Sequence, residues 1–113
     1  MKCIFCDIVA GKMPARTVYE DDQVVAFHDI NPQAPTHVLI VPRAHIPRLQ
    51  DAAEEQATLI GRLLLAANRV AERLGLDRSG YRVVINNGPD ALQTVYHLHL
   101  HLLGGRRMSW PPG

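Results

Sequence analysis

The sequence predicts an α+β domain in which an antiparallel sheet of about five strands carries one long helix and one short N-terminal helix. Several short segments are rich in β-branched and aromatic residues, or alternate in polarity, as strands do. One apolar stripe at helical spacing runs through residues 49–76. The links between segments are short, which favours antiparallel pairing. With 113 residues the chain is long enough for one domain, residues 1–113, and not for two.

Composition and charge exclude several classes of protein. The formal net charge is only +1 at pH 7, so no basic excess indicates a nucleic-acid surface. No apolar run is long enough to cross a bilayer, and Asp7 interrupts the apolar start of the chain, which argues against a signal peptide. The two cysteines are too few to staple a secreted fold. We therefore expect a cytoplasmic protein that binds neither nucleic acid nor membranes.

A short helix is the first expected element. Within residues 3–10, apolar side chains stand at helical spacing, at Ile4, Phe5, Ile8 and Val9. Gly11 and Pro14 are typical of the residues that end a helix, so we expect it to stop before residue 11.

Three strands are expected next. Residues 17–20 and 24–30 are β-branched and aromatic and flank the polar sequence DDQ, which predicts a hairpin. The sequence NPQAP is a turn, because its prolines cannot occupy a central strand. Residues 36–42, THVLIVP, then form a strand that ends at Pro42.

The long helix is predicted over residues 49–76. Asp51, with Glu54 three residues later, predicts an N-terminal cap, and Gly75 predicts the C-terminal cap. Its apolar stripe, which we interpret as core packing, comprises Leu59, Ile60, Leu63, Leu64, Ala67, Val70, Ala71 and Leu74.

Two further strands complete the sheet, residues 81–87 and 96–105, with a loop between them. The second, YHLHLHLLGG, alternates strictly. Because residues two apart on a strand face the same way, His97, His99 and His101 share one face and the leucines between them are buried on the other.

Three interpretations of this histidine face are open. A solvated polar face rarely uses three histidines in register. A zinc centre made by all three would require severe bending, because the first and third lie about 13 Å apart on a strand while zinc needs each nitrogen at about 2.0–2.1 Å. Nucleophilic and acid–base chemistry fits best. Neutral imidazole, with a pKa of about 6.5, attacks phosphorus, and a neighbouring group moves a proton to the leaving group.

Residues 97–103 match the pattern His-φ-His-φ-His-φ-φ, in which φ is apolar. Together with EDDQVVAFHDINPQAPTHVLIVPRAHI, GYRVVINNG and QTVYHLHLHLLGGRRMSWPPG, this pattern is similar to the histidine triad (HIT) family, and in particular to its Hint branch of purine nucleoside phosphoramidases. The resemblance covers nearly the whole chain. It implies a HIT-like fold and a homodimer in which two sheets join into one continuous sheet.

The resemblance also implies a catalytic set. The middle histidine, His99, would attack the α-phosphorus of a nucleotide and form a nucleotidyl–histidine intermediate, which water hydrolyses to a nucleoside monophosphate. His101 would contact phosphate oxygen, and His37 would take part in a proton relay to the leaving group. His97 completes the triad. No cofactor is implied for catalysis.

Further positions match the nucleotide-binding residues of the family. Asp29 would accept hydrogen bonds from the ribose hydroxyls, and Trp110 would reach the site of the partner subunit. A purine would lie in an apolar slot with little discrimination between adenine and guanine. The full implied set is Ile4, Phe5, Ile8, Phe27, His28, Asp29, Ile30, Asn86, Gln93, Thr94 and Trp110, of which Asn86, Gln93 and Thr94 would hold phosphate or leaving group.

The chain departs from the branch in the loop before the triad. Leu92 stands where glycine is usual, and Thr94 where serine is usual. If that position needs a positive φ, Leu92 is strained or the loop is rearranged.

The sequence Cys3-x-x-Cys6 has two interpretations. Zinc binding is one. The motif, together with His45 and the first triad histidine, His97, resembles the set of residues with which some bacterial relatives in the family hold zinc. The other is a pair of small buried thiols. A thioredoxin-like redox motif would need a preceding strand, which the sequence lacks. We expect a structural zinc bound by Cys3, Cys6, His45 and His97.

Three functions remain at this point. The leading one is hydrolysis of nucleoside 5′-phosphoramidates, with a purine nucleoside monophosphate or phosphoramidate as the bound partner. The alternatives are a dinucleoside polyphosphate hydrolase or nucleotidyl transferase, and a nucleotide-binding scaffold whose catalysis is incidental.

Overall fold

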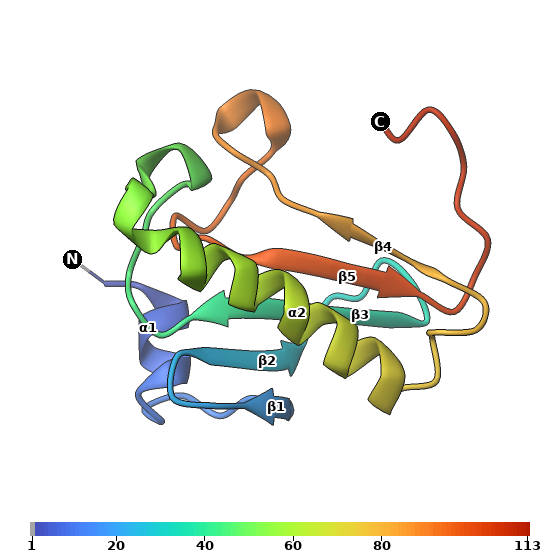
Figure 1. The fold of residues 1–113 in the computed structure, drawn as a ribbon, viewed down its shortest axis with the longest axis horizontal. Helices are drawn as coiled ribbons and strands as arrows, with labels where there is room; N and C mark the ends of the chain where they lie inside the picture. Colours follow the sequence, from blue (N-terminus) through green and yellow to red (C-terminus); the bar gives the residue numbers. More distant parts are fainter. Residues whose placement is uncertain (1) are drawn as a thin grey trace.

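A single antiparallel sheet of five strands forms the centre of the molecule, in the order β1-β2-β3-β5-β4. The computed structural model describes residues 2–113. Figure 1 shows helix α2 crossing one face of the sheet, while helix α1 lies at the end near the N-terminus. The strands are β1 (Thr17–Glu20), β2 (Val24–His28), β3 (Thr36–Pro42), β4 (Tyr81–Val84) and β5 (Leu100–Gly104). The predicted α+β architecture is confirmed.

Helix α2 (Ala57–Arg73) packs on β2, β3 and β5 and buries the main core. The side of α2 that faces the sheet is rich in small residues, and its buried members are Leu63, Ala66, Ala67, Val70 and Ala71. Small side chains let the helix approach the sheet closely. The observed stripe differs from the predicted one at two positions. Leu64, which was predicted to be buried, is exposed, and Ala66, which lay outside the predicted stripe, is buried.

The helix begins later than predicted. Residues 49–51 and 54–56 form two short 3₁₀ turns before α2, so the predicted cap at Asp51 and Glu54 is wrong. The carboxylate of Asp51 instead accepts hydrogen bonds from Arg48 at 2.9 Å. At the other end the prediction is confirmed, because Gly75 follows the helix with φ +74°, a conformation that glycine adopts without steric cost.

The opposite face of the sheet carries a second, smaller core beneath α1 (Ile4–Val9). It consists of Phe5 from the helix with Val25, Phe27, Leu39 and Val41 from β2 and β3. Residues of β2 and β3 therefore alternate between the two cores, as the period of a strand requires. This second face is where the histidines emerge.

Strand β5 is shorter than predicted, because regular pairing starts only at Leu100. Before Leu100 the chain no longer pairs with β3 and instead contacts the segment that follows β3 in the sequence. The backbone N–H of Leu98 donates to the carbonyl of Ile46 at 2.6 Å. Alternation persists nevertheless, since Leu98, Leu100 and Leu102 all lie in the main core.

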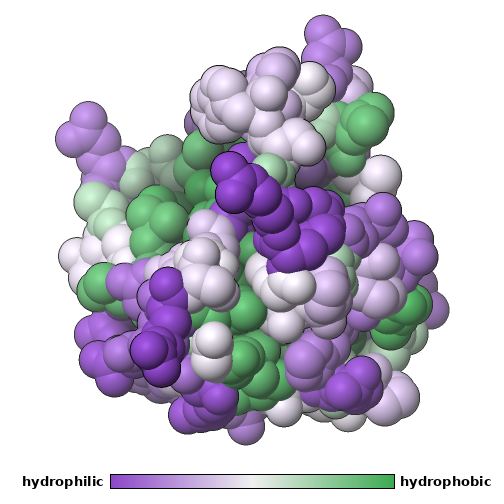
Figure 2. All heavy atoms as spheres, turned by 90° about the vertical axis from the view of Figure 1, so that its right-hand side faces the viewer, coloured by the Kyte–Doolittle hydropathy of each residue, from purple (hydrophilic) through white to green (hydrophobic). Residues whose placement is uncertain are grey.

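Figure 2, which shows the end of the molecule where the C-terminal tail lies, has scattered apolar areas between hydrophilic side chains. Within the described residues, no helix is long and apolar enough to span a membrane. The homodimer stays a prediction.

Candidate functional site

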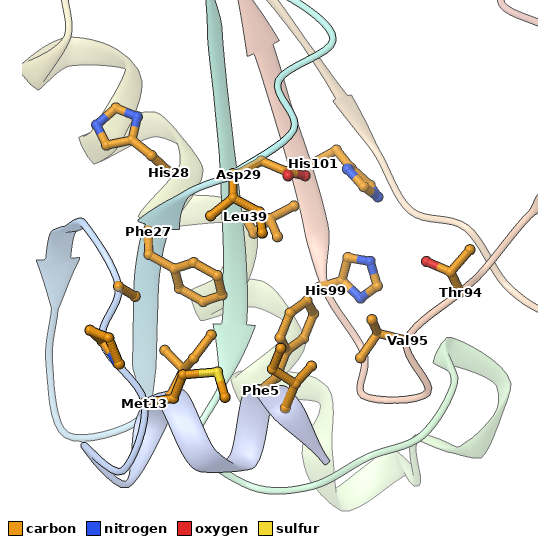
Figure 3. A pocket seen from close by; sticks show the side chains of 15 residues that line it. Phe5, Met13, Phe27, His28, Asp29, Leu39, Thr94, Val95, His99 and His101 are labelled. Atoms are coloured by element: carbon orange, nitrogen blue, oxygen red, sulfur yellow. The ribbon is translucent and has the colours of Figure 1, made fainter.

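A cavity of about 320 Å³ opens on the second face of the sheet, between α1, the end of β2 and the loop before β5. Figure 3 shows the rings of His99 and His101 side by side on one wall and the two phenylalanines, Phe5 and Phe27, on another. The cavity is lined by Ile4, Phe5, Ile8, Met13, Pro14, Ala15, Phe27, His28, Asp29, Ile30, Leu39, Thr94, Val95, His99 and His101.

The apolar side of the cavity, which we call the slot, is lined by phenylalanine and isoleucine side chains. The rings of Phe5 and Phe27 meet edge to face with centroids 5.5 Å apart, and Phe5 also meets the ring of His99 at 5.1 Å. Helix α1 supplies three of the lining residues, because its apolar spacing places Ile4, Phe5 and Ile8 on one side of the helix. Such a slot accepts a flat aromatic ring by burial and stacking.

His99 presents a free lone pair to the cavity. Its Nδ1 lies 2.7 Å from the carbonyl oxygen of His97. A carbonyl oxygen only accepts hydrogen bonds, so Nδ1 carries the ring hydrogen and Nε2 is unprotonated. The residue is buried and lines the cavity, so an unprotonated ring nitrogen is held in one orientation there. A nitrogen of this kind can act as a nucleophile.

His37 and His101 form a chain of hydrogen bonds on the same face, which we call the histidine chain. The backbone N–H of Gln33 donates to Nδ1 of His37 at 3.0 Å, and Nε2 of His37 lies 2.9 Å from Nδ1 of His101. Since Nδ1 of His37 accepts, its Nε2 donates, and His101 in turn carries its hydrogen on Nε2. The chain therefore ends in an N–H group on a residue that lines the cavity.

Asp29 sits beside this chain at the end of β2. Its Oδ1 accepts from the backbone N–H of Asn31 at 2.8 Å, and its Oδ2 lies 3.5 Å from Nε2 of His37. The trio of Asp29, His37 and His101 has the composition of a metal site. However, His37 could give Nε2 to a metal only by losing its single ring hydrogen and becoming an anion, because Nδ1 already accepts from Gln33.

Burial keeps these rings neutral. It lowers the pKa values of His37 and His99. For His101, burial together with the nearby His99 and His37 lowers the pKa to about 4, although the charge of Asp29 opposes the shift. At neutral pH the group is therefore a set of oriented imidazoles with alternating donors and lone pairs.

Several implied site residues lie apart from the cavity. Gln93 is buried, and its amide bonds to the backbone of Gly88, Pro47 and Val95, so it holds the loop before β5 in place. Asn86 lies after β4, and Trp110 lies in the exposed C-terminal tail, where the guanidinium of Arg82 stands 5.7 Å from its ring centroid. Within residues 2–113, neither side chain belongs to the cavity lining.

Leu92 adopts the conformation that glycine would favour. Its φ is 62° and its ψ 39°, the left-handed region, and 79% of its surface is exposed. The loop therefore keeps the backbone shape expected for glycine and holds Leu92 in a strained conformation. Thr94, two residues later, reaches the cavity.

Cys3, Cys6, His45 and His97 form a second group next to the cavity, which we call the cysteine–histidine cluster. Their ligand atoms all lie within 4.8 Å of one another. Nδ1 of His97 is 3.4 Å from Sγ of Cys3 and 3.6 Å from Sγ of Cys6. Nδ1 of His45 is 3.2 Å from Nδ1 of His97 and 3.3 Å from Sγ of Cys6.

These four distances match four of the six edges of a tetrahedron of zinc ligands, and the other two pairs of ligand atoms lie within 4.8 Å. With Zn–S of about 2.3 Å and Zn–N of about 2.0–2.1 Å, tetrahedral zinc has N···N edges of about 3.3 Å and N···S edges of about 3.5 Å. His97 also has the required tautomer, because its Nε2 donates to the carbonyl of Pro42 at 2.7 Å and leaves Nδ1 unprotonated. The four residues fit a structural zinc ion.

The sequence did not predict several residues that line the cavity or contact its histidines. Leu39 shares the strand period of His37 and could have been found from it. Met13, Pro14 and Ala15 form a loop, and no local pattern places a loop against a cavity. Gln33 contacts His37 through its backbone, for which a side-chain motif gives no signal.

Known proteins resemble this chain closely. The family model described as HIT domain matches residues 10–108. A 14 kDa zinc-binding protein of Zea mays is 53% identical over 112 residues, which cover 97% of this chain and 87% of that protein. A HIT family hydrolase from Legionella pneumophila has a crystal structure with a TM-score of 0.97 and 48% identity, covering 99% of this chain and 100% of that one.

Two more distant structures carry informative names. A histidine triad nucleotide-binding protein from Candida albicans has a TM-score of 0.83 at 33% identity, over 97% of this chain and 83% of that one. A Zn-bound histidine triad family protein from Mycobacterium smegmatis has a TM-score of 0.79 at 35% identity, over 100% of this chain and 81% of that one.

Proposed function

The chain belongs to the HIT domain family, and we propose that it hydrolyses purine nucleoside 5′-phosphoramidates through a nucleotidyl intermediate on His99. The family supports a hydrolase with a nucleotide-binding fold. The choice of phosphoramidate as substrate and of His99 as nucleophile is our own.

One observation carries this proposal, the hydrogen bond from Nδ1 of His99 to the carbonyl of His97. It fixes the tautomer in which Nε2 is a lone pair, and the ring lines a cavity with an apolar slot at one side. A nucleophile held in one orientation in a partly dry site avoids much of the entropic cost of attack.

The reaction we propose has two displacements. First, Nε2 of His99 bonds to the α-phosphorus while the bond from phosphorus to the leaving nitrogen breaks, and the departing amine takes up a proton that the His37–His101 pair has first taken from solvent. Water then attacks the phosphorus and the bond to His99 breaks, which releases the nucleoside monophosphate and neutral His99.

His101 and His37 serve the phosphate and the proton. The Nε2 hydrogen of His101 would donate to a phosphate oxygen, where negative charge develops. The pair can also pass a proton to the departing amine, but only after taking one up, because a neutral His37 that lost its Nε2 hydrogen would be an anion. Asp29, with Oδ2 3.5 Å from Nε2 of His37, stabilises the protonated pair.

The lining of the cavity supports a single phosphate rather than a polyphosphate chain. Among the described residues that line it, none is lysine or arginine. Uncharged donors such as Thr94 and His101 suit a monoanionic α-phosphate. In our proposal Asp29 binds the ribose hydroxyls, and the purine lies between the phenylalanines and the isoleucines of α1.

A quenched single-turnover reaction tests the nucleophile. Protein mixed with an adenosine 5′-phosphoramidate and stopped in acetonitrile at neutral pH should yield, by peptide mass spectrometry, an adenylyl group on the peptide that contains His99. Label on a different residue, or turnover without any labelled protein, would overturn the assignment. Diadenosine tetraphosphate at the same concentration should turn over more slowly; faster turnover would favour the polyphosphate alternative.

We also propose that the cysteine–histidine cluster holds structural zinc. The tetrahedral distances among its ligand atoms and the zinc-binding relatives support this. Zinc supplies no chemical step in our proposal, since four protein ligands leave it no open position. It would fasten α1, which contains Cys6 and is preceded by its N-cap Cys3, to the segment that contains His97.

The assembly we propose is a cytoplasmic homodimer in which Trp110 of one subunit approaches the cavity of the other. Supporting it, the exposed tail that carries Trp110 extends away from the helix α1 of its own chain (Figure 1). Light scattering after size-exclusion chromatography should give twice the mass of 12.6 kDa.

A further inference from the structure

Besides the carboxylate of Asp29, whose Oδ2 lies 3.5 Å from Nε2 of His37, one backbone N–H group outside the cavity sets the proton positions in the histidine chain. That group belongs to Gln33 and donates to Nδ1 of His37. It fixes the hydrogen of His37 on Nε2, and so the hydrogen of His101 on Nε2 as well. Without this donor, both rings could place their hydrogens on Nδ1, and His101 would then present a lone pair to the cavity in place of a donor.

Gln33 lies in an exposed loop and is contacted by the segment that follows strand β5. The guanidinium of Arg106 donates from Nη2 to the carbonyl oxygen of Gln33 at 3.2 Å. Beside it, Gly105 has φ +90°, and a Cβ there would lie 2.9 Å from Cβ of Pro35, so this turn can approach the loop only because it has no side chain. The segment 104–106 is therefore packed against the loop of residues 31–36.

We propose that Arg106 is a positioning residue which, by holding Gln33, sets the tautomers of His37 and His101. Arg106 is exposed and lies outside the cavity lining, so it acts on the reaction through the loop. The effect on tautomers stands on the hydrogen bonds alone, whereas the effect on rate rests on the proposed function.

The expected kinetic effect follows from the phosphate contact. If a fraction of the molecules carries the wrong tautomer, His101 turns a lone pair toward a phosphate oxygen and repels it. This repulsion weakens stabilisation of the transition state, in which negative charge develops on phosphate. We therefore expect kcat to decrease while KM changes little. For one exposed hydrogen bond we expect a decrease of about 3- to 10-fold.

Three variants test the inference. Arg106→Ala removes the contact, and Arg106→Lys restores a donor. Arg107→Ala is the matched control, because it removes the same charge from the neighbouring exposed residue. Long-range ¹H–¹⁵N spectra of the histidines, recorded without substrate, report which ring nitrogen is protonated.

In the wild type and in Arg107→Ala, His37 and His101 should each show a protonated Nε2 and a bare Nδ1. In Arg106→Ala the Nδ1 and Nε2 shifts should move toward one another as the tautomers mix, and Arg106→Lys should recover them in part. Wild-type tautomers in Arg106→Ala, or an equal change in Arg107→Ala, would overturn the inference.

The two proposals fail in different ways. If the tautomers mix in Arg106→Ala but the wild type itself does not hydrolyse phosphoramidates, the proposed function fails and the positioning role stands. If the wild type hydrolyses them and Arg106→Ala keeps both its tautomers and its kcat, the positioning role fails and the function stands.

Discussion

His97 and His99 lie two residues apart on one segment, and the structure gives them opposite tautomers. His97 donates from Nε2 to Pro42 and turns the lone pair of Nδ1 toward the two thiols. His99 donates from Nδ1 to the carbonyl of His97 and turns the lone pair of Nε2 toward the cavity. The comparison teaches that the role of a histidine here is set by the carbonyl oxygen that takes its hydrogen.

The cysteine–histidine cluster and the cavity also share helix α1. Cys3 and Cys6 belong to the cluster, whereas Ile4, Phe5 and Ile8 between and beyond them line the cavity. Ligands and walls are thus interleaved within two turns of the chain. Anything that moves the cluster should move the slot, although the proposed nucleophile, His99, lies on another element.

The largest expected effect separates the two histidines. His99→Asn removes the nucleophile and should lower kcat on an adenosine phosphoramidate by on the order of 10⁴-fold, with AMP affinity nearly unchanged. His97→Asn keeps the nucleophile and should act mainly by losing zinc. Stopped-flow kinetics and calorimetric AMP titration measure both. Turnover that persists in His99→Asn would remove the distinction between the two residues.

Zinc stabilisation is the next largest effect. At a free zinc concentration about 100 times its Kd, the wild type should gain about 2.7 kcal/mol in free energy of unfolding. Cys6→Ser replaces a thiolate ligand, so its stability should not respond to zinc in that range. Urea unfolding with zinc, and with magnesium as the control metal, measures the difference.

Native mass spectrometry of untagged protein gives the metal content directly. Protein that has never met a chelator should carry about one zinc per chain. A zinc-free wild type, or a Cys6→Ser variant that responds to zinc as the wild type does, would refute the cluster as a metal site. Chelation should also raise KM more than it lowers kcat, since α1 carries walls of the slot.

Acid should destabilise the protein, and His101 should account for part of this loss of stability. The pKa of His101 is about 4 in the fold and about 6.5 in an unfolded chain. Between these values the unfolded chain binds more protons, so the free energy of unfolding falls as the pH falls from about 7 to about 4. Urea unfolding of His101→Gln, with chelator present throughout, should show a shallower fall than the wild type; an equal slope would contradict the assignment.

Leu92 gives the smallest effect, in the loop that leads into both regions. Leu92→Gly removes the strain of φ 62° and should stabilise the protein by about 1 kcal/mol, because the leucine side chain is mostly exposed and contributes little burial. Leu92→Ala is the matched control, since alanine keeps the steric penalty, and its stability should stay close to that of the wild type. Thermal unfolding compares the three proteins.

Local patterns in the sequence determined the architecture and most of the cavity. The alternation of residues 96–105 sends the leucines into the core under α2 and leaves the histidines on the other face. The spacing of Ile4, Phe5 and Ile8 predicts one face of α1, and that face lines the cavity. Such periods repeat over neighbouring residues, so the sequence alone contains them.

Only the tertiary structure decided which atoms act. Pairing of β5 begins at Leu100, because the segment before it bonds to Ile46. Helix α2 begins at Ala57, after two 3₁₀ turns, the first of which bonds to Asn87. The amide of Gln93, which the sequence suggested for phosphate, is used by three backbone groups. The tautomers of His37, His97 and His99 depend on a backbone N–H or carbonyl placed by the fold, and a sequence does not specify which backbone group a ring will meet.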